Sequence, residues 1–274
     1  MTLPFSALDG MIRVYPAGAG PLQGIGLLWA HGGGFMHGDL DMPEADAVSR
    51  AFADRGAVVA SVDYRRVVDG ADRFPAGSDD VLTSWRWLVA EASELGADPA
   101  RLFIGGASAG ANLATGAVLR MLGHEPATAP APLPAGVFLA YPTLLAVQPA
   151  PDAELRAALD ADPAADHFPA SVVWEMYENY LGRDPEGAPI SAIPGLATAA
   201  QLAGFPATIM VNDDTDELRV SGEAFAATLA DAGVSIDVSR ELGTTHGHLN
   251  RPADADAPAF ERTIQRVAEW FAAR

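Results

Sequence analysis

The stretch RLFIGGASAGANLA, residues 101–114, decides the fold that this sequence predicts. Its first residues are apolar and of strand character, and the residues from Gly110 to Leu122 have the spacing of a helix. Between the two, the segment GASAG matches the pattern G-x-S-x-G and places Ser108 in the turn. A strand that turns abruptly into a helix strains the turn residue, and only Gly and Ala fit where the two elements pass closely. The pattern therefore predicts a sharp turn that presents Ser108 at the N-terminus of a helix.

A plainer interpretation of the same turn is that Ser108 caps the helix. Small residues are abundant in this chain, so the pentapeptide alone has little weight. Its position between a strand and a helix favours a nucleophile elbow, whose hydroxyl stands where amide groups stabilise developing negative charge. Ser108 is therefore the candidate nucleophile.

Outward from this turn, short β-rich runs alternate with longer helical patterns. We expect strands over residues 11–16, 24–30, 57–64, 101–106, 135–141, 206–212 and 234–242. We expect helices over residues 43–55, 79–95, 110–122, 220–232 and 259–272, and an Ala- and Pro-rich linker over 125–134. Such alternation predicts an α/β fold with a mostly parallel sheet and helices on both faces. The first two strands are separated by a short turn, AGAGP, which predicts an antiparallel edge.

Residues 147–201 interrupt this alternation. They contain seven prolines, two helical patches at 152–160 and 171–181, and no strand signal. A stretch of this length between two core strands is better explained as an insertion than as a loop. We therefore expect a small helical lid, inserted into a core that is formed by residues 1–146 and 202–274.

The composition of the 274 residues excludes several classes of protein. The net charge of −19 opposes binding to nucleic acid and to anionic membranes, and is interpreted as a solubilising surface. The absence of Cys excludes disulfides and thiolate metal sites. The longest apolar stretch, residues 131–147, is broken by prolines, and residues 1–10 have neither a basic leader nor an apolar core. We therefore expect no membrane span, no signal peptide and a cytoplasmic protein.

A glycine-rich loop, HGGGF at residues 31–35, follows the apolar run GIGLLWA. The bare amides of an HGGG loop supply one half of the oxyanion hole in hydrolases with a nucleophile elbow, and the amide of Ala109 would supply the other. A phosphate cradle would need a G-K-[ST] signature, but the chain has no lysine. Gly33 and Gly34 are therefore candidate oxyanion donors, and His31 is expected to hold the loop.

A serine nucleophile needs a base, and in this architecture the chain order is serine, acid, histidine. His167, His246 and His248 lie well after Ser108. His167 falls inside the lid insertion, ahead of the last core strands. His246 lies between the final strand and the last helix, and the following Gly247 suits a loop that lets the ring reach the serine. His246 is the candidate base, and His248 is the alternative.

The orienting carboxylate should follow the strand over residues 206–212. Four acids crowd there: Asp213, Asp214, Asp216 and Glu217. The first three could each sit at the C-terminal end of the strand, so the pattern does not choose among them. The surplus acids would be solvated or would stabilise a helix N-terminus.

In combination these motifs resemble the hormone-sensitive-lipase family of α/β-hydrolases, the bacterial family IV esterases. HGGGF is similar to the oxyanion loop of that family, and VDYRR and RFPAGSDDV resemble its DYR and FPA segments. DPARLFIGGASAGANLA resembles its nucleophile block, DELRVSGEAFAATLADAGV its acid block and HGHLN its base motif. The resemblance covers nearly the whole chain.

This resemblance implies the α/β-hydrolase fold and assigns roles to the candidates. It implies Asp216 as the acid and His246 as the base. The oxyanion donors would be the amides of Gly33, Gly34 and Ala109.

The sequence also departs from the family. Ala107 stands where the family has an acid, and Ala111 replaces a glycine. The acid falls one residue late after the strand, which keeps Asp213 and Asp214 as alternatives. Only about ten residues precede the first expected strand, so the lid would consist mainly of residues 147–201 and the site would be more open.

The implied activity is hydrolysis of small, short-acyl, soluble esters through an acyl-enzyme, with no metal or cofactor. The alternatives are an acyltransferase or amidase with the same triad, and a non-catalytic protein that binds small molecules. Phe35, Trp174 and Tyr177 are the pocket candidates, although Trp174 and Tyr177 share a helical face that could equally pack the lid onto the core. The sequence leaves open whether the chain acts alone or as a homodimer.

Overall fold

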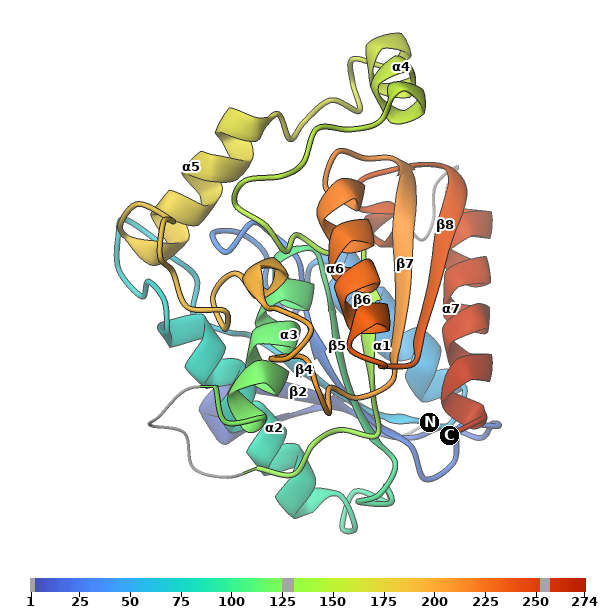
Figure 1. Cartoon of the computed structure of the whole chain (residues 1–274). Helices are drawn as coiled ribbons and strands as arrows, with labels where there is room; N and C mark the ends of the chain where they lie inside the picture. Colours follow the sequence, from blue (N-terminus) through green and yellow to red (C-terminus); the bar gives the residue numbers. More distant parts are fainter. Residues whose placement is uncertain (1–2, 125–130, 252–256) are drawn as a thin grey trace.

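The computed structural model describes residues 3–124, 131–251 and 257–274, and within them an eight-stranded sheet forms the centre (Figure 1). The strand order is β1-β2-β4-β3-β5-β6-β7-β8. The strands are β1 (Phe5–Ala7), β2 (Ile12–Tyr15), β3 (Gly26–Ala30), β4 (Val58–Val62), β5 (Leu102–Ala107), β6 (Gly136–Ala140), β7 (Thr208–Thr215) and β8 (Ile236–Thr245). From β4 to β8 every pairing is parallel, which confirms the predicted mostly parallel sheet.

The antiparallel edge exists, but its predicted pairing is wrong. β2 pairs antiparallel with β1 and β4, while β3 lies inside the sheet between β4 and β5. Every residue of β3 is buried, so this strand gains most from parallel neighbours on both sides. The three-residue strand β1 was not expected because it is too short and too exposed to show an apolar pattern.

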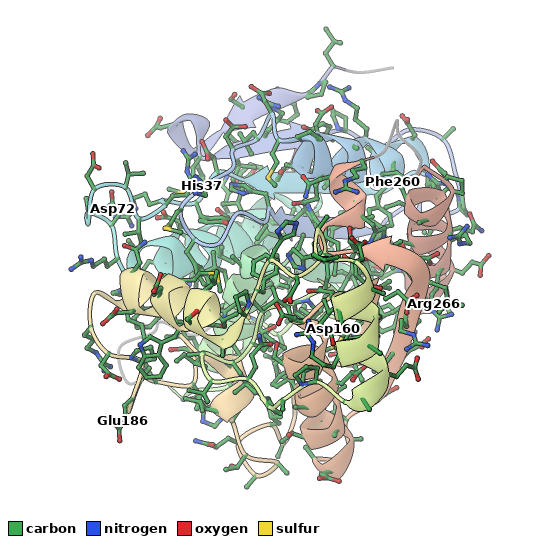
Figure 2. All side chains as sticks on the ribbon, turned by 90° about the horizontal axis from the view of Figure 1, so that it is seen from above. His37, Asp72, Asp160, Glu186, Phe260 and Arg266 are labelled. Atoms are coloured by element: carbon green, nitrogen blue, oxygen red, sulfur yellow. The ribbon has the colours of Figure 1, made fainter. Side chains whose placement is uncertain are left out.

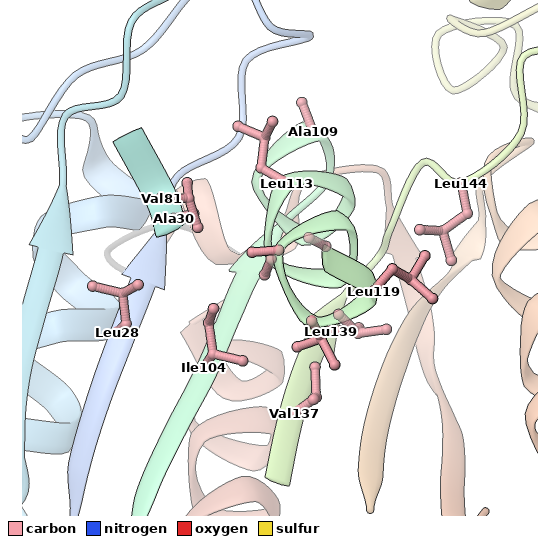
Figure 3. Packing of buried hydrophobic residues seen from close by; sticks show 14 of the residues in the cluster. Leu28, Ala30, Val81, Ile104, Ala109, Leu113, Leu119, Val137, Leu139 and Leu144 are labelled. Carbon is pink, nitrogen blue, oxygen red and sulfur yellow. The ribbon is translucent and has the colours of Figure 1, made fainter. Parts of the chain in front are cut away.

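Helices cover both faces of the sheet, as predicted (Figure 1). One face carries α1 (Pro43–Asp54) and α7 (Ala257–Ala272), and the other carries α2 (Ala76–Glu91), α3 (Ala109–Met121) and α6 (Arg219–Asp231). Figure 3 shows how side chains of neighbouring strands, Leu28, Ile104 and Val137, form a layer beside Leu113 and Leu119 of α3. The central helix α3 is thereby packed over the middle of the sheet, at the end of β5.

Residues 147–201 contain α4 (Ala153–Ala161), α5 (Ala170–Leu181) and η2 (Pro194–Leu196), close to the two helical patches expected from the sequence. Both α helices lie above the carboxyl ends of the strands, as Figure 1 and the view from above in Figure 2 show. The buried side chains of α5 belong to the same apolar cluster as α2 and α3. The part of the segment after α5 also lies close to α3, because a Cβ at Gly116 of α3 would lie 2.1 Å from the carbonyl oxygen of Ser191. The segment therefore shares the core of the molecule.

Two further expectations concern apolar stretches and the linker. Among the helices of the described residues, none is both long enough and apolar enough to cross a membrane. Most of the linker expected over residues 125–134 lies outside the described residues.

Candidate active site

Ser108 occupies a strained turn between β5 and α3. Its backbone has φ 51° and ψ −115°, in the left-handed half of conformational space that side chains other than glycine rarely adopt. The side chain makes no capping hydrogen bond to the helix, so the capping interpretation does not hold. The turn instead holds the hydroxyl at the floor of a cavity, where the residue is 7% exposed.

The small residues around Ser108 are required by the approach of backbone to backbone. A Cβ at Gly106 would lie 2.5 Å from the carbonyl carbon of Gly110, and a Cβ at Gly110 would lie 2.1 Å from the carbonyl oxygen of Ala30. No side chain can be accommodated at those distances. Ala107 is fully buried in the apolar cluster that includes Trp29, which suits a small apolar side chain there.

The structure brings Ser108, His246 and Asp216 together. The Oγ of Ser108 lies 3.1 Å from Nε2 of His246, and Nδ1 of His246 lies 2.8 Å from Oδ2 of Asp216. The histidine follows β8 and the aspartate follows β7, so the carboxyl ends of neighbouring parallel strands meet at the end of β5. In contrast, His167 is exposed and His248 is buried against another carboxylate.

Charge around His246 favours the protonated ring. Burial alone would lower the pKa of His246, but the carboxylates of Asp216 and Asp213 outweigh it and the pKa is raised. Asp216 is fully buried, and its other oxygen accepts a hydrogen bond from the amide of Leu218 at 2.9 Å. The carboxylate is thereby fixed in the orientation that holds the proton of His246 on Nδ1 and leaves Nε2 free to accept from Ser108.

The other acids after β7 have different partners. Asp213 accepts hydrogen bonds from the amide of Gly247 at 2.7 Å and from His248 at 2.5 Å. Asp214 pairs with Arg240 at 3.1 Å. The remaining acid, Glu217, accepts from the amide of Phe168 at 2.8 Å. Of the acids that the sequence left open, Asp216 is therefore the one that contacts Nδ1 of His246.

Carboxylate and imidazole atoms of Asp213, Asp216 and His246 lie within 4.8 Å of one another, the one group in the described part of the chain that could hold a metal ion. These atoms are already engaged in the hydrogen bonds given above. The arrangement fits a hydrogen-bonded network better than a set of metal ligands.

The glycine-rich loop lies beside Ser108 with its amides exposed to the cavity. Gly33 and Gly34 have φ of 118° and 60°, and among the described residues neither amide donates a hydrogen bond to the protein. The amide of Ala109 is the first of α3 and has no acceptor within the helix. His31 is fully buried and stacks on Tyr64 with ring centroids 4.4 Å apart, in a structural position. The predicted oxyanion donors therefore lie together around the serine.

Glu44, which none of the sequence motifs indicated, anchors this loop. Its carboxylate is fully buried and accepts hydrogen bonds from the amide of Gly32 at 2.9 Å and from Nε1 of Trp29 at 2.5 Å. The signal was present in the sequence, because Glu44 shares the apolar face of α1 with Val48 and Phe52 at a spacing of four residues. A charged residue on an otherwise buried helical face indicates a specific partner in the core.

Glu44 should make stability depend on pH. Burial raises its pKa to about 7 from an ordinary value of 4.5. As pH rises from 4.5 to 7 the unfolded chain releases this proton while the folded chain keeps it, so the folded state loses stability. We expect the free energy of unfolding of wild type relative to Glu44→Gln to fall by about 2 kcal/mol between pH 5 and pH 8. Urea unfolding at both pH values measures this difference. An equal change in the free energy of unfolding between pH 5 and pH 8 in the two proteins would contradict it.

A cavity of about 600 Å³ opens above Ser108 and His246. The glycine-rich loop forms part of the wall, and α5 contributes another part through Val172, Glu175, Met176 and Asn179. Phe168 packs against His246 with ring centroids 4.6 Å apart. The cavity is large enough for a small organic substrate and is mostly apolar.

The three predicted pocket residues do not line this cavity. Phe35 is buried and stacks on Tyr180 at 4.0 Å between centroids. Tyr177 is buried and donates a hydrogen bond to the carbonyl of Thr143 at 3.1 Å. Trp174 lines a separate cavity of about 360 Å³. Of the two α5 candidates, Tyr177 packs on the core, whereas other residues of α5, among them Glu175 and Asn179, meet the substrate cavity.

Comparison with known proteins agrees with this arrangement. A sequence model for proteins with the alpha/beta hydrolase fold matches residues 27–250. The carboxylesterase NlhH of Mycobacterium tuberculosis is 35% identical over 239 residues, which cover 84% of this chain and 70% of that protein. An ethyl acetate hydrolase of Pseudomonas putida is 32% identical over 247 residues, covering 87% of this chain and 71% of its own.

Solved structures are similar over the same extent. Brefeldin A esterase, described as a bacterial homologue of human hormone-sensitive lipase, superimposes with a TM-score of 0.76 at 28% identity. The match covers 99% of this chain and 76% of the esterase chain. A bacterial heroin esterase superimposes with a TM-score of 0.71 at 30% identity, covering 98% of this chain and 82% of its own. These neighbours confirm the fold and the resemblance to the hormone-sensitive-lipase family that the motifs predicted.

Proposed function

The chain belongs to the α/β-hydrolase family, and from this premise we propose that it is a serine carboxylesterase that hydrolyses small, short-acyl esters. The observation that carries the proposal is the hydrogen-bonded chain from Ser108 through His246 to Asp216, with distances of 3.1 Å and 2.8 Å. Curated relatives that act as carboxylesterases support the same reaction class.

In the proposed mechanism His246 removes the proton of Ser108 as the serine oxygen attacks the ester carbonyl. Asp216 keeps the imidazole in the required tautomer and stabilises the imidazolium that forms. His246 then gives the proton to the leaving alcohol. Water repeats the cycle on the acyl-enzyme, so that the carboxylic acid is released and the serine is restored.

Negative charge develops on the substrate oxygen in each tetrahedral intermediate. We assign its stabilisation to the amides of Gly33, Gly34 and Ala109. Gly33 and Gly34 line the cavity, Ala109 directly follows Ser108, and none of the three amides is used by the protein's own described acceptors. Each such donor contributes roughly 3 kcal/mol to the transition state when it is already in position. Glu44 would assist by holding the amide of the preceding Gly32.

We assign the lid to residues 147–201 and the catalytic core to residues 1–146 and 202–274. In support, α5 supplies one wall of the cavity above Ser108. Phe168, just before α5, packs on His246 with ring centroids 4.6 Å apart.

The substrate range follows from the cavity. Methionines 36, 42 and 176 give an adaptable apolar wall, and Glu175 is the one acidic residue, with no arginine, among the described lining residues. We expect kcat/KM for p-nitrophenyl esters to be highest between acetate and hexanoate. Butyrate should exceed the anionic monosuccinate of equal length by at least about tenfold, because Glu175 repels the extra charge and no arginine lines the cavity. Spectrophotometric initial rates measure both, and preferred cleavage of the succinate would contradict this specificity.

Product analysis separates the alternatives that share the triad. An acyltransferase would form transfer products when an alcohol is added, and an amidase would cleave the matching anilide at a comparable rate. A protein that only binds esters would not react with a fluorophosphonate at Ser108, whereas the proposed hydrolase is labelled there.

A further inference from the structure

A second aspartate–histidine pair lies beside the proposed triad, and the mechanism given above does not use it. In the segment HGHLN, His248 stands two residues after His246. His248 is 1% exposed and Asp213 is fully buried, so both are polar groups removed from water. Buried groups of this kind are expensive unless their hydrogen bonds are complete.

The hydrogen bonds of this pair connect four parts of the fold. Asp213 stands near the end of β7 and accepts from Thr244 of β8 at 2.8 Å, from the amide of Gly247 at 2.7 Å and from His248 at 2.5 Å. The other ring nitrogen of His248 lies 2.9 Å from Oγ1 of Thr263 on α7. The network therefore ties the loop that carries His246 to both neighbouring strands and to the last helix.

The amide of Gly247 is the link to the base. Gly247 follows His246 directly and has φ 87°, a left-handed conformation in which the chain turns back. Its amide is held by Oδ2 of Asp213, while Oδ1 is held in turn by His248 and Thr244. The backbone after the base is therefore anchored by the buried carboxylate.

Asp213 also acts on His246 through its charge. The charged groups that act on the imidazole are Asp216, which bonds it, and Asp213, which lies near it; Tyr141 and His248 are the titratable neighbours. Burial lowers the pKa of His246, and both carboxylates raise it. Loss of the charge at position 213 should therefore make the base weaker without breaking its bond to Asp216.

We propose that Asp213, held by His248, is a positioning residue that fixes the loop of the base His246 and sets the pH range in which that base works. This inference rests on the proposed function for its kinetic readout. Asp213 does not contact the substrate in this proposal. The pair His248–Asp213 supports the loop of His246 from outside the chain of hydrogen bonds through Ser108, His246 and Asp216.

The charge is tested with Asp213→Asn. The amide oxygen can still accept from Gly247 and the amide nitrogen can donate to the other tautomer of His248, so the geometry is preserved while the charge is removed. We expect the acid limb of kcat/KM to move to lower pH by about one unit. Asp214→Asn is the matched control, because Asp214 carries the same charge one residue along but pairs with Arg240, and we expect no shift of the limb.

An NMR titration of the His246 ring gives the same comparison without activity. Its pKa should fall in Asp213→Asn and stay at the wild-type value in Asp214→Asn. If wild type hydrolyses no ester, the proposed function fails, but the titration still decides the present inference. Coincident titrations of wild type and Asp213→Asn would overturn it.

The positioning role is tested separately at His248. His248→Asn keeps an N–H donor close to the place of Nδ1, whereas His248→Leu removes it. We expect His248→Leu to lower kcat by about tenfold with KM nearly unchanged, and His248→Asn to recover most of that loss. This arm also stands if Asp213→Asn does not fold. Equal kcat values for the two His248 variants would overturn the positioning role.

Discussion

Replacement of Ser108 by alanine is expected to abolish ester hydrolysis while the protein stays folded. In the proposed mechanism the hydroxyl becomes acylated, so kcat/KM for p-nitrophenyl acetate should fall by roughly 10⁴-fold or more. Stability should change little or improve, because the side chain makes no capping bond and alanine fits the surrounding small residues. Initial rates and thermal unfolding of the same preparation measure the two quantities.

Ser84→Ala is the matched control for this experiment. Ser84 is a fully buried serine on α2, and its hydroxyl has no hydrogen-bond partner among the described residues. Its replacement removes the same atom from the core at a distance from the cavity and should leave kcat/KM unchanged. Retained activity in Ser108→Ala would show that another nucleophile carries the reaction.

The proximity of Ser108, the glycine-rich loop and His246 could be predicted from the sequence because each depends on a local backbone requirement. Gly106 and Gly110 are needed because a Cβ at these positions would lie 2.6 Å and 2.1 Å from the carbonyl oxygen of Ala30. In a parallel sheet, motifs that follow successive strands meet at the same edge. Local signals and this one topological rule are sufficient to bring Ser108 and His246 together.

The acid could not be chosen from the sequence for a physical reason. The pairing of β7 with β8 is irregular near the strand end: Asp213 pairs with Glu241 and Thr215 with Thr245, so β8 carries two extra residues there. Such an irregularity re-aims the side chains that follow it, and spacing alone does not show where they point. Asp213 lies beside this irregularity and contacts His248, whereas Asp216, just beyond the end of β7, contacts His246.

The strand order and the residues of the cavity walls could not be predicted from the sequence, because both depend on contacts between distant parts of the chain. The periodicity of β2 and β3 does not reveal that β4 lies between them. On α5, the spacing of Trp174 and Tyr177 indicates a helical face but not the rotation of the helix against the core. The buried polar contacts of Glu44 depend on α1 lying beside the glycine-rich loop, a relation that only the folded chain establishes.

Asp216→Asn is expected to lower kcat/KM by roughly 10³–10⁴-fold. An asparagine amide would donate to Nδ1 of His246, so the ring proton would move to Nε2 and the base could no longer accept from Ser108. The fold should persist, because the side-chain oxygen can still accept from the amide of Leu218. Initial rates at the pH of maximal activity measure the loss.

The comparison with the two neighbouring acids makes this prediction specific. Asp213→Asn removes a charge near His246 but leaves the tautomer alone, so at the pH of maximal activity it should cost far less than Asp216→Asn. Asp214→Asn changes an ion pair with Arg240 outside the hydrogen-bonded chain and should cost least. The expected order of activity is therefore set by what each carboxylate touches: Nδ1 of the base, the backbone that follows the base, or neither. A larger loss in Asp213→Asn or Asp214→Asn than in Asp216→Asn would mean that a different carboxylate orients the base.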